Sequence, residues 1–319
     1  MWYNEVMKVY DLVSELVRVD SAGRLRAVEG SALFDQSIMG FRQDAEEVWR
    51  SVSQRFAEKE DQYGLLFRFD EAPKLYALDA FLIAQPLLKD ADKLKLLAEF
   101  FVAFYLGVHY IDDHIEHRDK FYSKFRVSGL DSIDTQRGAM PFSFMLIISD
   151  IIHDVLSELG LDEAAINTML RKVRSVYLNE IRYFTPEKRR DLTADEVLEM
   201  KQRQITGQCL LPICDLLHAL DSSALSDKEW EKLRKGIVRL GSLTQITDDI
   251  RDESIDAILG NANLLIVLKG DAEALAAIYQ AEQQEMIECL RGIYDNHAID
   301  ALVSLPLYPF TIKKRGQRR

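Results

Sequence analysis

Residues 101–116 read FVAFYLGVHYIDDHIE, an apolar run that ends abruptly in three carboxylates. The apolar positions recur at the spacing of a helix. On a helix each residue advances by about 100°, so Asp112, Glu116 and Asp119 fall in one stripe, with Asp113 beside it. Carboxylates rarely follow apolar residues so closely unless they face a cavity that binds a cation. The segment therefore predicts a helix with an apolar face and an acidic end.

The same stripe, followed back along the helix, is aromatic. It carries Val108, Tyr105, Phe104 and Phe101. A cavity lined by these side chains would be dry and electron-rich, although plain core packing explains any one of them equally well. Gly107 and Val108 are small, which predicts room for a long apolar chain one turn below Asp112.

A second acidic segment ends another helical run. Residues 241–256 read GSLTQITDDIRDESID. Asp248, Asp252 and Asp256 are spaced i, i+4 and i+8, with Asp249 beside them. The residues one turn below Asp248 are small or polar, as expected of a helix that lines a cavity: Gly241, Thr244 and Gln245.

The two clusters together predict a site for divalent metal. Like charges at i, i+4 destabilise a helix by a few tenths of a kcal/mol, and a bound cation relieves that repulsion. Oxygen ligands without cysteine favour a hard ion, so we expect several Mg²⁺ ions, with Mn²⁺ as a substitute. The predicted ligands are Asp112, Asp113, Glu116, Asp248, Asp249, Asp252 and Asp256. A solvated helix end remains the alternative for either cluster alone, and Arg251 can reduce the repulsion in the second.

Composition narrows the choice of partner. The 319 residues carry a net charge of −12, which argues against nucleic acid, whereas metal ions would let an acidic protein bind an anionic substrate. The three cysteines lack zinc-like spacing and suit a reducing compartment. No secretory signal or apolar run of about 18 residues is visible. We therefore expect a cytoplasmic protein without stable membrane insertion, and a homodimer is compatible with this.

Helical periodicity dominates the chain, with 15 Gly and 7 Pro as breaks. The fold class predicted is all-α, one large helical bundle around a central apolar cavity, formed by residues 1–319 as a single domain. Residues 1–60 would pack on it as N-terminal helices and residues 310–319 form a basic flexible tail. The expected helices are 2–19, 37–60, 74–88, 91–119, 140–159, 162–184, 197–220, 226–258 and 271–295, with 120–138 as a loop or short helix. Thr193–Glu196 is a capping-box pattern that opens a helix, and Gly260 is expected to end the helix over 226–258.

These motifs resemble those of the class I isoprenoid synthase superfamily. Asp112-Asp113-x-x-Glu116 is similar to its first aspartate-rich motif, and Gln245-x-x-Asp248-Asp249-x-x-Asp252 to the second motif of prenyl diphosphate synthases. Gly260-Asn261-x-Asn263-Leu264 is similar to the segment that often follows. The resemblance implies an all-α bundle in which Mg²⁺ and a substrate diphosphate bind between the two motifs.

The chain departs from the elongating prenyl synthases in its basic residues. Those enzymes carry Gly-Lys-Arg before the first motif and Arg-Arg-Gly after it, to hold the second diphosphate. Residues 67–74 and 118–120 reproduce neither pattern. The terpene synthases of the superfamily instead place metal ligands at i, i+4 and i+8, which Asp248, Asp252 and Asp256 match in spacing although not in the middle hydroxyl.

A further similarity to the terpene synthases lies upstream of the second cluster. Arg203, Thr206 and Gly207 are spaced like the residues that sense the diphosphate in that family. The resemblance thus predicts a class I terpene synthase that ionises an allylic prenyl diphosphate of fifteen carbons or more and cyclises or quenches the cation. Catalysis is assigned to Asp112, Asp113, Arg203, Asp248 and Asp252. Substrate contacts are assigned to Phe101, Phe104, Tyr105, Val108, Arg203, Thr206, Gly207 and Gln245.

Other classes remain open. A prenyltransferase would use the same metal site. A metal phosphohydrolase of the His-Asp type could use His153-Asp154, but it leaves the second cluster unexplained. A carboxylate di-metal bundle needs Glu-x-x-His pairs, and the chain offers only Asp150-x-x-His153 and Asp215-x-x-His218. The last alternative is a non-catalytic helical scaffold.

Overall fold

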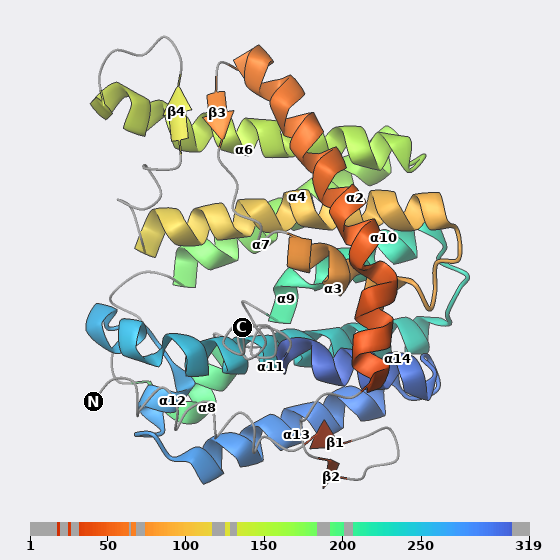
Figure 1. The fold of residues 1–319 in the computed structure, drawn as a ribbon, viewed down its shortest axis with the longest axis vertical. Coiled ribbons are helices and arrows are strands. Elements are labelled where there is room, and N and C mark those ends of the chain that lie inside the picture. Colours follow the sequence, from red (N-terminus) through yellow and green to blue (C-terminus); the bar gives the residue numbers. More distant parts are fainter. Residues whose placement is uncertain are drawn as a thin grey trace. The chain divides into compact units, whose positions relative to one another are not determined.

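The computed structural model (Figure 1) describes the backbone of residues 18–19, 25–26, 32–63, 65–67, 74–116, 125–127, 133–183, 192–200 and 207–307. Side chains are described for residues 41–60, 62, 76–111, 143–179, 192–200, 207–253, 256–258 and 260–306. The fold is all-α, as predicted, with two short two-stranded ribbons added to the helices. Contacts group the chain into two units. Unit 1 comprises residues 1–38, 183–214 and 225–319, and unit 2 comprises residues 39–182 and 215–224.

Unit 2 is built around α4 (Ala91–Glu116), which packs against α3 (Lys74–Ala84) and α6 (Ile133–Glu158). Its other helices are α2 (Ala32–Tyr63, from residue 39 on) and α7 (Glu163–Tyr183). The strands β3 (Leu65–Phe67) and β4 (Phe125–Val127) pair antiparallel. Helix α2 crosses α4 and α6 in Figure 1.

One guanidinium joins three of these helices. The Nε atom of Arg55 on α2 donates to Glu99 on α4 at 2.9 Å, and its Nη atoms contact the carboxylate of Glu158 on α6 at 2.6 and 2.7 Å. Glu99 is buried, so its charge needs this partner. The hydrogen bond from Arg55 lowers the pKa of Glu158. The network fixes the order of the helices around α4.

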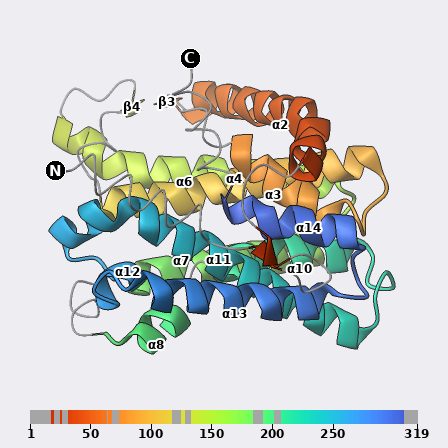
Figure 2. The same cartoon turned by 60° about the horizontal axis from the view of Figure 1, so that its bottom comes forward.

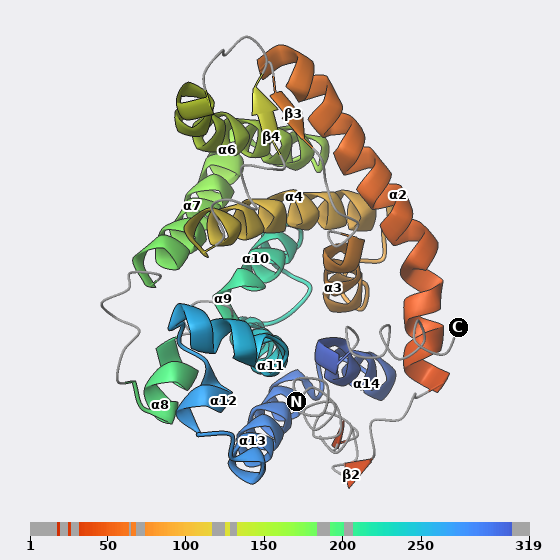
Figure 3. The ribbon, with the colours of Figure 1, turned by 60° about the vertical axis from the view of Figure 1, so that its left-hand side comes forward.

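Unit 1 is built on a pair of long helices, α11 (Asp227–Leu259) and α13 (Ala272–Leu290), which lie side by side in Figures 2 and 3. Gly236 allows the approach, because a Cβ atom there would lie 2.7 Å from Leu290 Cδ2. The shorter elements are α8 (Ala194–Val197), α9 (Gly207–Cys209), α12 (Leu264–Val267), α14 (Asn296–Ser304), η3 (Leu305–Leu307), and the ribbon of β1 (Arg18–Val19) with β2 (Leu25–Arg26). Helix α10 (Leu211–Leu220) contributes residues to both units.

Most of the predicted helices are confirmed, with ends shifted by a few residues. The capping box at Thr193–Glu196 is present, and Gly260 ends α11 with φ 72°. The helix over 2–19 is wrong at its end, where residues 18–19 form β1, and its other residues lie outside the described part. The stretch 120–138, predicted as a loop or short helix, contains the first turns of α6 and also β4, which was not predicted. The basic tail at 310–319 and its predicted mobility lie outside the described residues.

The structure also refines the expectation about apolar runs. In the described part of the chain, residues 91–111 of α4 form one helix long and apolar enough to cross a membrane. However, 78% of its most apolar window is buried inside the protein, as in a core helix. The single-domain organisation stays a prediction.

Candidate functional site: the acidic clusters

The second cluster lies in the C-terminal third of α11. The carboxylates of Asp248 and Asp252 reach the surface, with side-chain exposures of 39% and 36%. Arg251 lies between them: its Nη2 contacts Asp248 Oδ1, and its Nε and Nη2 contact Asp252 Oδ1 and Oδ2 at 3.2 and 3.3 Å. We call Asp248 and Asp252 the outer pair. One turn of helix and one guanidinium connect its two members.

Asp249, next to the outer pair in sequence, is directed into the protein and is 0% exposed. Its Oδ1 accepts a hydrogen bond from Gln245 Nε2 at 2.9 Å, and its Oδ2 accepts from the backbone N–H of Leu264 at 2.7 Å. Both carboxylate oxygens of Asp249 therefore accept hydrogen bonds inside the protein. Gln245, predicted to contact the substrate, is itself buried and holds this carboxylate.

Asp256 is held in the same way by the turn that follows the helix. It is 8% exposed, and its two oxygens accept from Asn261 Nδ2 at 3.0 Å and Asn263 Nδ2 at 2.8 Å. Gly260 adopts the left-handed conformation that brings the chain back toward Asp256, a conformation that glycine adopts without strain. We call Asp249 and Asp256 the inner pair.

Asn263 joins the inner pair to the start of α12. It is completely buried, and its Oδ1 caps α12 by accepting from the backbone N–H groups of Leu265 and Ile266. Its Nδ2 donates to the backbone oxygen of Asp249 at 2.7 Å as well as to Asp256. Every polar atom of this carboxamide is thus engaged. The four acidic residues therefore form two pairs. The inner pair is hydrogen-bonded to the α11–α12 turn, and the outer pair faces outward.

The first cluster closes α4, and the helix extends through Glu116 as predicted. The side chains of Asp112, Asp113 and Glu116, and the whole of Asp119, lie outside the described residues. Among the described side chains, no three His, Cys, Asp or Glu residues gather closely enough to hold a metal ion. The predicted metal ligands therefore stay a prediction, and within the second cluster the outer pair has the accessible oxygens.

The aromatic stripe of α4 is mostly core. Phe101 and Phe104 are 0% exposed and pack against each other with centroids 5.9 Å apart. Val108 is also buried, whereas Tyr105 keeps part of its surface. The ring of Tyr105 lies 4.1 Å from that of Tyr76 on α3, a contact that sequence reasoning missed because it joins two helices. Of the predicted wall, Tyr105 is the ring with accessible surface.

The predicted room at Gly107 is wrong. A Cβ atom there would lie 2.2 Å from the hydroxyl oxygen of Tyr177 on α7. That hydroxyl donates to the backbone oxygen of Phe104 at 2.9 Å, and the Tyr177 ring stacks on Phe104 at 5.5 Å. The side chain of Tyr177, from another helix, fills the space beside Gly107. No spacing rule within α4 reveals such a partner.

A partly buried carboxyl group accompanies the aromatic contact between α3 and α4. Asp79 lies three residues after Tyr76 on α3, among fully buried residues such as Ala80 and Phe81. Burial raises the pKa of Asp79 to about 8, so the carboxyl group is protonated at neutral pH. This carboxyl group adds no negative charge to unit 2 at pH 7.

The predicted diphosphate sensor is described in part. Arg203 and Thr206 lie outside the described residues. Gly207 is buried and begins α9, after residues 198–200, which form a turn of π-helix. The helix predicted over 197–220 is thus divided into α9 and α10.

The residues that a His-Asp phosphohydrolase or a di-metal bundle would use as metal ligands make other contacts in this structure. Lys59 lies 3.0 Å from Asp154 and 3.9 Å from Asp150. His153 lies 4.0 Å from Asp154 and 3.7 Å from Glu163 through its two ring nitrogens. A lysine among these carboxylates occupies the position that a cation would need. The Lys59 contacts are ion pairs that join α2 to α6.

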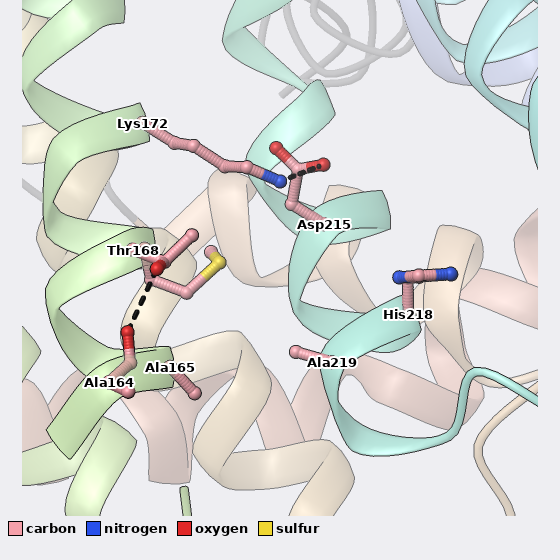
Figure 4. A pocket seen from close by; sticks show the side chains of 8 residues that line it. Ala164, Ala165, Thr168, Lys172, Asp215, His218 and Ala219 are labelled. Atoms are coloured by element: carbon pink, nitrogen blue, oxygen red, sulfur yellow. Dashed lines mark hydrogen bonds and ion pairs between the residues drawn. The ribbon is translucent and has the colours of Figure 1, made fainter. Parts of the chain in front are cut away.

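The second di-metal pair lines a shallow pocket of about 340 Å³ between α7 and α10, all in unit 2 (Figure 4). Lys172 Nζ lies 2.9 Å from Asp215 Oδ1, and Asp215 is 7% exposed. His218 points away from Asp215 in Figure 4. The pocket holds a buried carboxylate that a lysine already neutralises, which is a packing contact between two helices.

Solved structures share this fold. A polyprenyl synthase from Caulobacter crescentus, complexed with calcium and isoprenyl diphosphate, matches 86% of this chain and 97% of its own, with 14% identity and a TM-score of 0.59. A geranylgeranyl pyrophosphate synthetase from Geoglobus acetivorans matches 88% and 99%, with 16% identity and a TM-score of 0.56. A geranyltransferase from Legionella pneumophila matches 88% and 98%, with 13% identity and a TM-score of 0.54. No protein-family model and no curated protein matches the sequence.

The chain therefore has the all-α fold of the class I isoprenoid synthases, as its motifs suggested, in a divergent form. At these identities the likeness shows the fold alone.

Proposed function

We propose that this protein is a divalent-metal-dependent prenyltransferase that ionises an allylic prenyl diphosphate and transfers the prenyl group to an acceptor. The observation that carries the proposal is the outer pair, Asp248 and Asp252, whose carboxylates are partly exposed on α11 of a chain with the isoprenoid synthase fold. The first motif, Asp112 to Glu116, ends α4 in the same chain.

The donor set fits a hard divalent ion. Asp248 and Asp252 offer carboxylate oxygens one helical turn apart, the ligand type that Mg²⁺ prefers. Asp112, Asp113 and Glu116 are proposed as the ligands of the first motif, and Mn²⁺ as a substitute ion. The bound metal would neutralise the charge that develops on the diphosphate as the allylic C–O bond breaks. Asp249 and Asp256 are proposed to position the outer pair instead of ligating metal.

Protein side chains would supply the remaining functions. Arg203 is proposed to bind the diphosphate through its planar fork, which matches two phosphate oxygens at once. Thr206 and Gly207 are proposed to line the same end of the substrate. Tyr105 is the proposed contact for the allylic cation, since a cation over an aromatic face gains about 0.5–2 kcal/mol.

Two observations favour transfer over cyclisation. The i+8 position that the terpene synthase motif uses is Asp256, and both its oxygens accept hydrogen bonds from asparagines of the following turn. The similar solved structures are prenyl-transferring enzymes. Cyclisation remains the second candidate, because the chain lacks the Gly-Lys-Arg and Arg-Arg-Gly segments that hold the second diphosphate in elongating synthases. Cyclisation needs no second diphosphate, so the absence of those segments is compatible with it.

The test is a product analysis with Mg²⁺. The protein is incubated with geranyl, farnesyl and geranylgeranyl diphosphates, each with and without isopentenyl diphosphate, and the extracted products are identified. We expect longer prenyl diphosphates, formed only when isopentenyl diphosphate is present. Diphosphate release with hydrocarbon or alcohol products in its absence would favour the terpene synthase. Diphosphate release in neither condition would contradict both candidates.

A further inference from the structure

We propose that Arg251 is an internal counter-cation that occupies the outer pair until a divalent metal displaces it. The inference rests on the proposed function, since it takes Asp248 and Asp252 as metal ligands. It adds a regulatory role for a residue that neither the motif nor the fold assigns.

The geometry places one guanidinium on both candidate ligands. Arg251 forms a fork with Asp252, in which Nε faces Oδ1 and Nη2 faces Oδ2 at 3.2 and 3.3 Å. The same Nη2 also contacts Asp248 Oδ1. Three carboxylate oxygens are thus held by a single cation. A metal ion held by the outer pair would use these carboxylates, so the guanidinium and the metal would compete for them.

The inner pair explains why the competition is confined to the outer pair. Asp249 and Asp256 accept hydrogen bonds from Gln245, Leu264, Asn261 and Asn263, so each of their four carboxylate oxygens already has a partner within or beside the α11–α12 turn. The α11–α12 turn, to which they are hydrogen-bonded, also restrains the last turns of α11. The outer pair would therefore keep its one-turn spacing when a metal replaces the arginine.

Charge determines the direction of the exchange. The outer pair carries two negative charges and Arg251 one positive charge, which leaves a net charge of −1 that attracts a divalent ion. Arg251 is 41% exposed, so it leaves the pair without disturbing the core. An exposed ion pair of this kind weakens the binding of a competing cation modestly, by about two- to five-fold. The expected effect is a site that fills at a higher Mg²⁺ concentration than its carboxylates alone would allow.

The test measures metal binding without turnover. Mn²⁺ is titrated into the full-length protein, and free Mn²⁺ is followed by its electron paramagnetic resonance signal. We expect Arg251→Gln to lower the Kd for Mn²⁺ by about two- to five-fold, and Arg251→Lys, which keeps the charge without the fork, to fall between the variant and the wild type. Lys232→Gln is the matched control, because it removes one exposed positive charge from α11 far from the outer pair, and its Kd should equal that of the wild type.

An unchanged or raised Kd in Arg251→Gln would overturn the inference. Asp252→Asn separates this result from a failure of the proposed function. If Asp252→Asn weakens Mn²⁺ binding at least ten-fold while Arg251→Gln leaves it unchanged, the metal site stands and the counter-cation role is wrong. If Asp252→Asn leaves Mn²⁺ binding unchanged, the outer pair is not the metal site, and both proposals fail.

Discussion

The hydroxyl of Tyr177 donates a hydrogen bond to the backbone oxygen of Phe104 at 2.9 Å, across the space that a side chain at Gly107 would fill. This contact joins α7 to α4 within unit 2. It also buries the ring of Tyr177 against that of Phe104. The glycine is therefore a packing requirement of the helix that ends in the first acidic motif.

We predict that Gly107→Ala destabilises the protein by about 1–3 kcal/mol, because the new methyl group would overlap the Tyr177 ring. Tyr177→Phe should cost less, about 0.5–1.5 kcal/mol, since it removes one hydrogen bond and keeps the ring. Urea unfolding of both variants measures these changes. In the double variant Gly107→Ala with Tyr177→Ala, the cost of the alanine at 107 should largely disappear. A cost that persists without the ring would show that Tyr177 is not its cause.

For the second acidic cluster, the sequence predicts where the four residues lie but not which side chains are buried. The positions of Asp248, Asp249, Asp252 and Asp256 place all four near one end of a helix, and that placement is confirmed. Their role as metal ligands stays a prediction, and spacing alone treats the four alike, because which carboxylates turn inward depends on the α11–α12 turn. For Asp256 the inward direction is set by a hydrogen bond from Asn263, which lies seven residues further along the chain. The Asn261-x-Asn263 pattern after Gly260 was the available signal, since buried carboxamides need partners.

The aromatic stripe of α4 illustrates a second limit. Helical spacing correctly places Phe101, Phe104 and Tyr105 together, but it does not tell which rings meet other helices. Phe104 is covered by Tyr177, and Tyr105 by Tyr76. Such contacts arise from the packing of helices that are far apart in sequence. Periodicity therefore predicted the helix and its apolar face, and only the packed structure separates core from accessible surface.

The two pairs of the second cluster should respond in opposite ways to loss of charge. Asp249→Asn would place an amide N–H₂ against the donors Gln245 Nε2 or Leu264 N, so we predict a destabilisation of about 1.5–3 kcal/mol. Asp252→Asn should change stability by less than about 0.5 kcal/mol, because its side chain is partly exposed and its ion pair with Arg251 lies at the surface. It should nevertheless lower Mg²⁺-dependent prenyl transfer at least about 100-fold. Urea unfolding and initial rates on the same preparations measure both effects, and equal activity losses without a stability difference would contradict the division into pairs.

Asn263 is predicted to be the most sensitive residue of the α11–α12 turn. Asn263→Ala removes the cap of α12 and leaves Asp256 short of a donor in a buried place, so we expect a loss of about 2–4 kcal/mol. Asn261→Ala is the matched control, since it removes one hydrogen bond to the same carboxylate from a less buried position, and should cost about 1 kcal/mol. Amide hydrogen exchange at residues 252–259 provides a local readout. Exchange there should accelerate in Asn263→Ala, and unchanged protection would show that the turn does not restrain the helix end.

Asp79 predicts how stability depends on pH. Its pKa is raised to about 8 in the folded protein, from an ordinary value of 3.8. Between about pH 4 and pH 8 the folded state therefore keeps a proton that the unfolded state has lost. Stability from this group should fall as the pH rises through that window, with a limiting slope of about 1.4 kcal/mol per pH unit, and should not change further above it.

The variant Asp79→Asn removes this proton and should remove the slope with it. We expect it to match the wild type near pH 4 and to be more stable than the wild type at pH 8, because a neutral side chain carries no cost of burying a charge. Melting temperatures at half-unit steps from pH 4 to pH 9 give the comparison. Parallel profiles for Asp79→Asn and the wild type would mean that the carboxyl group of Asp79 is ionised in the folded protein.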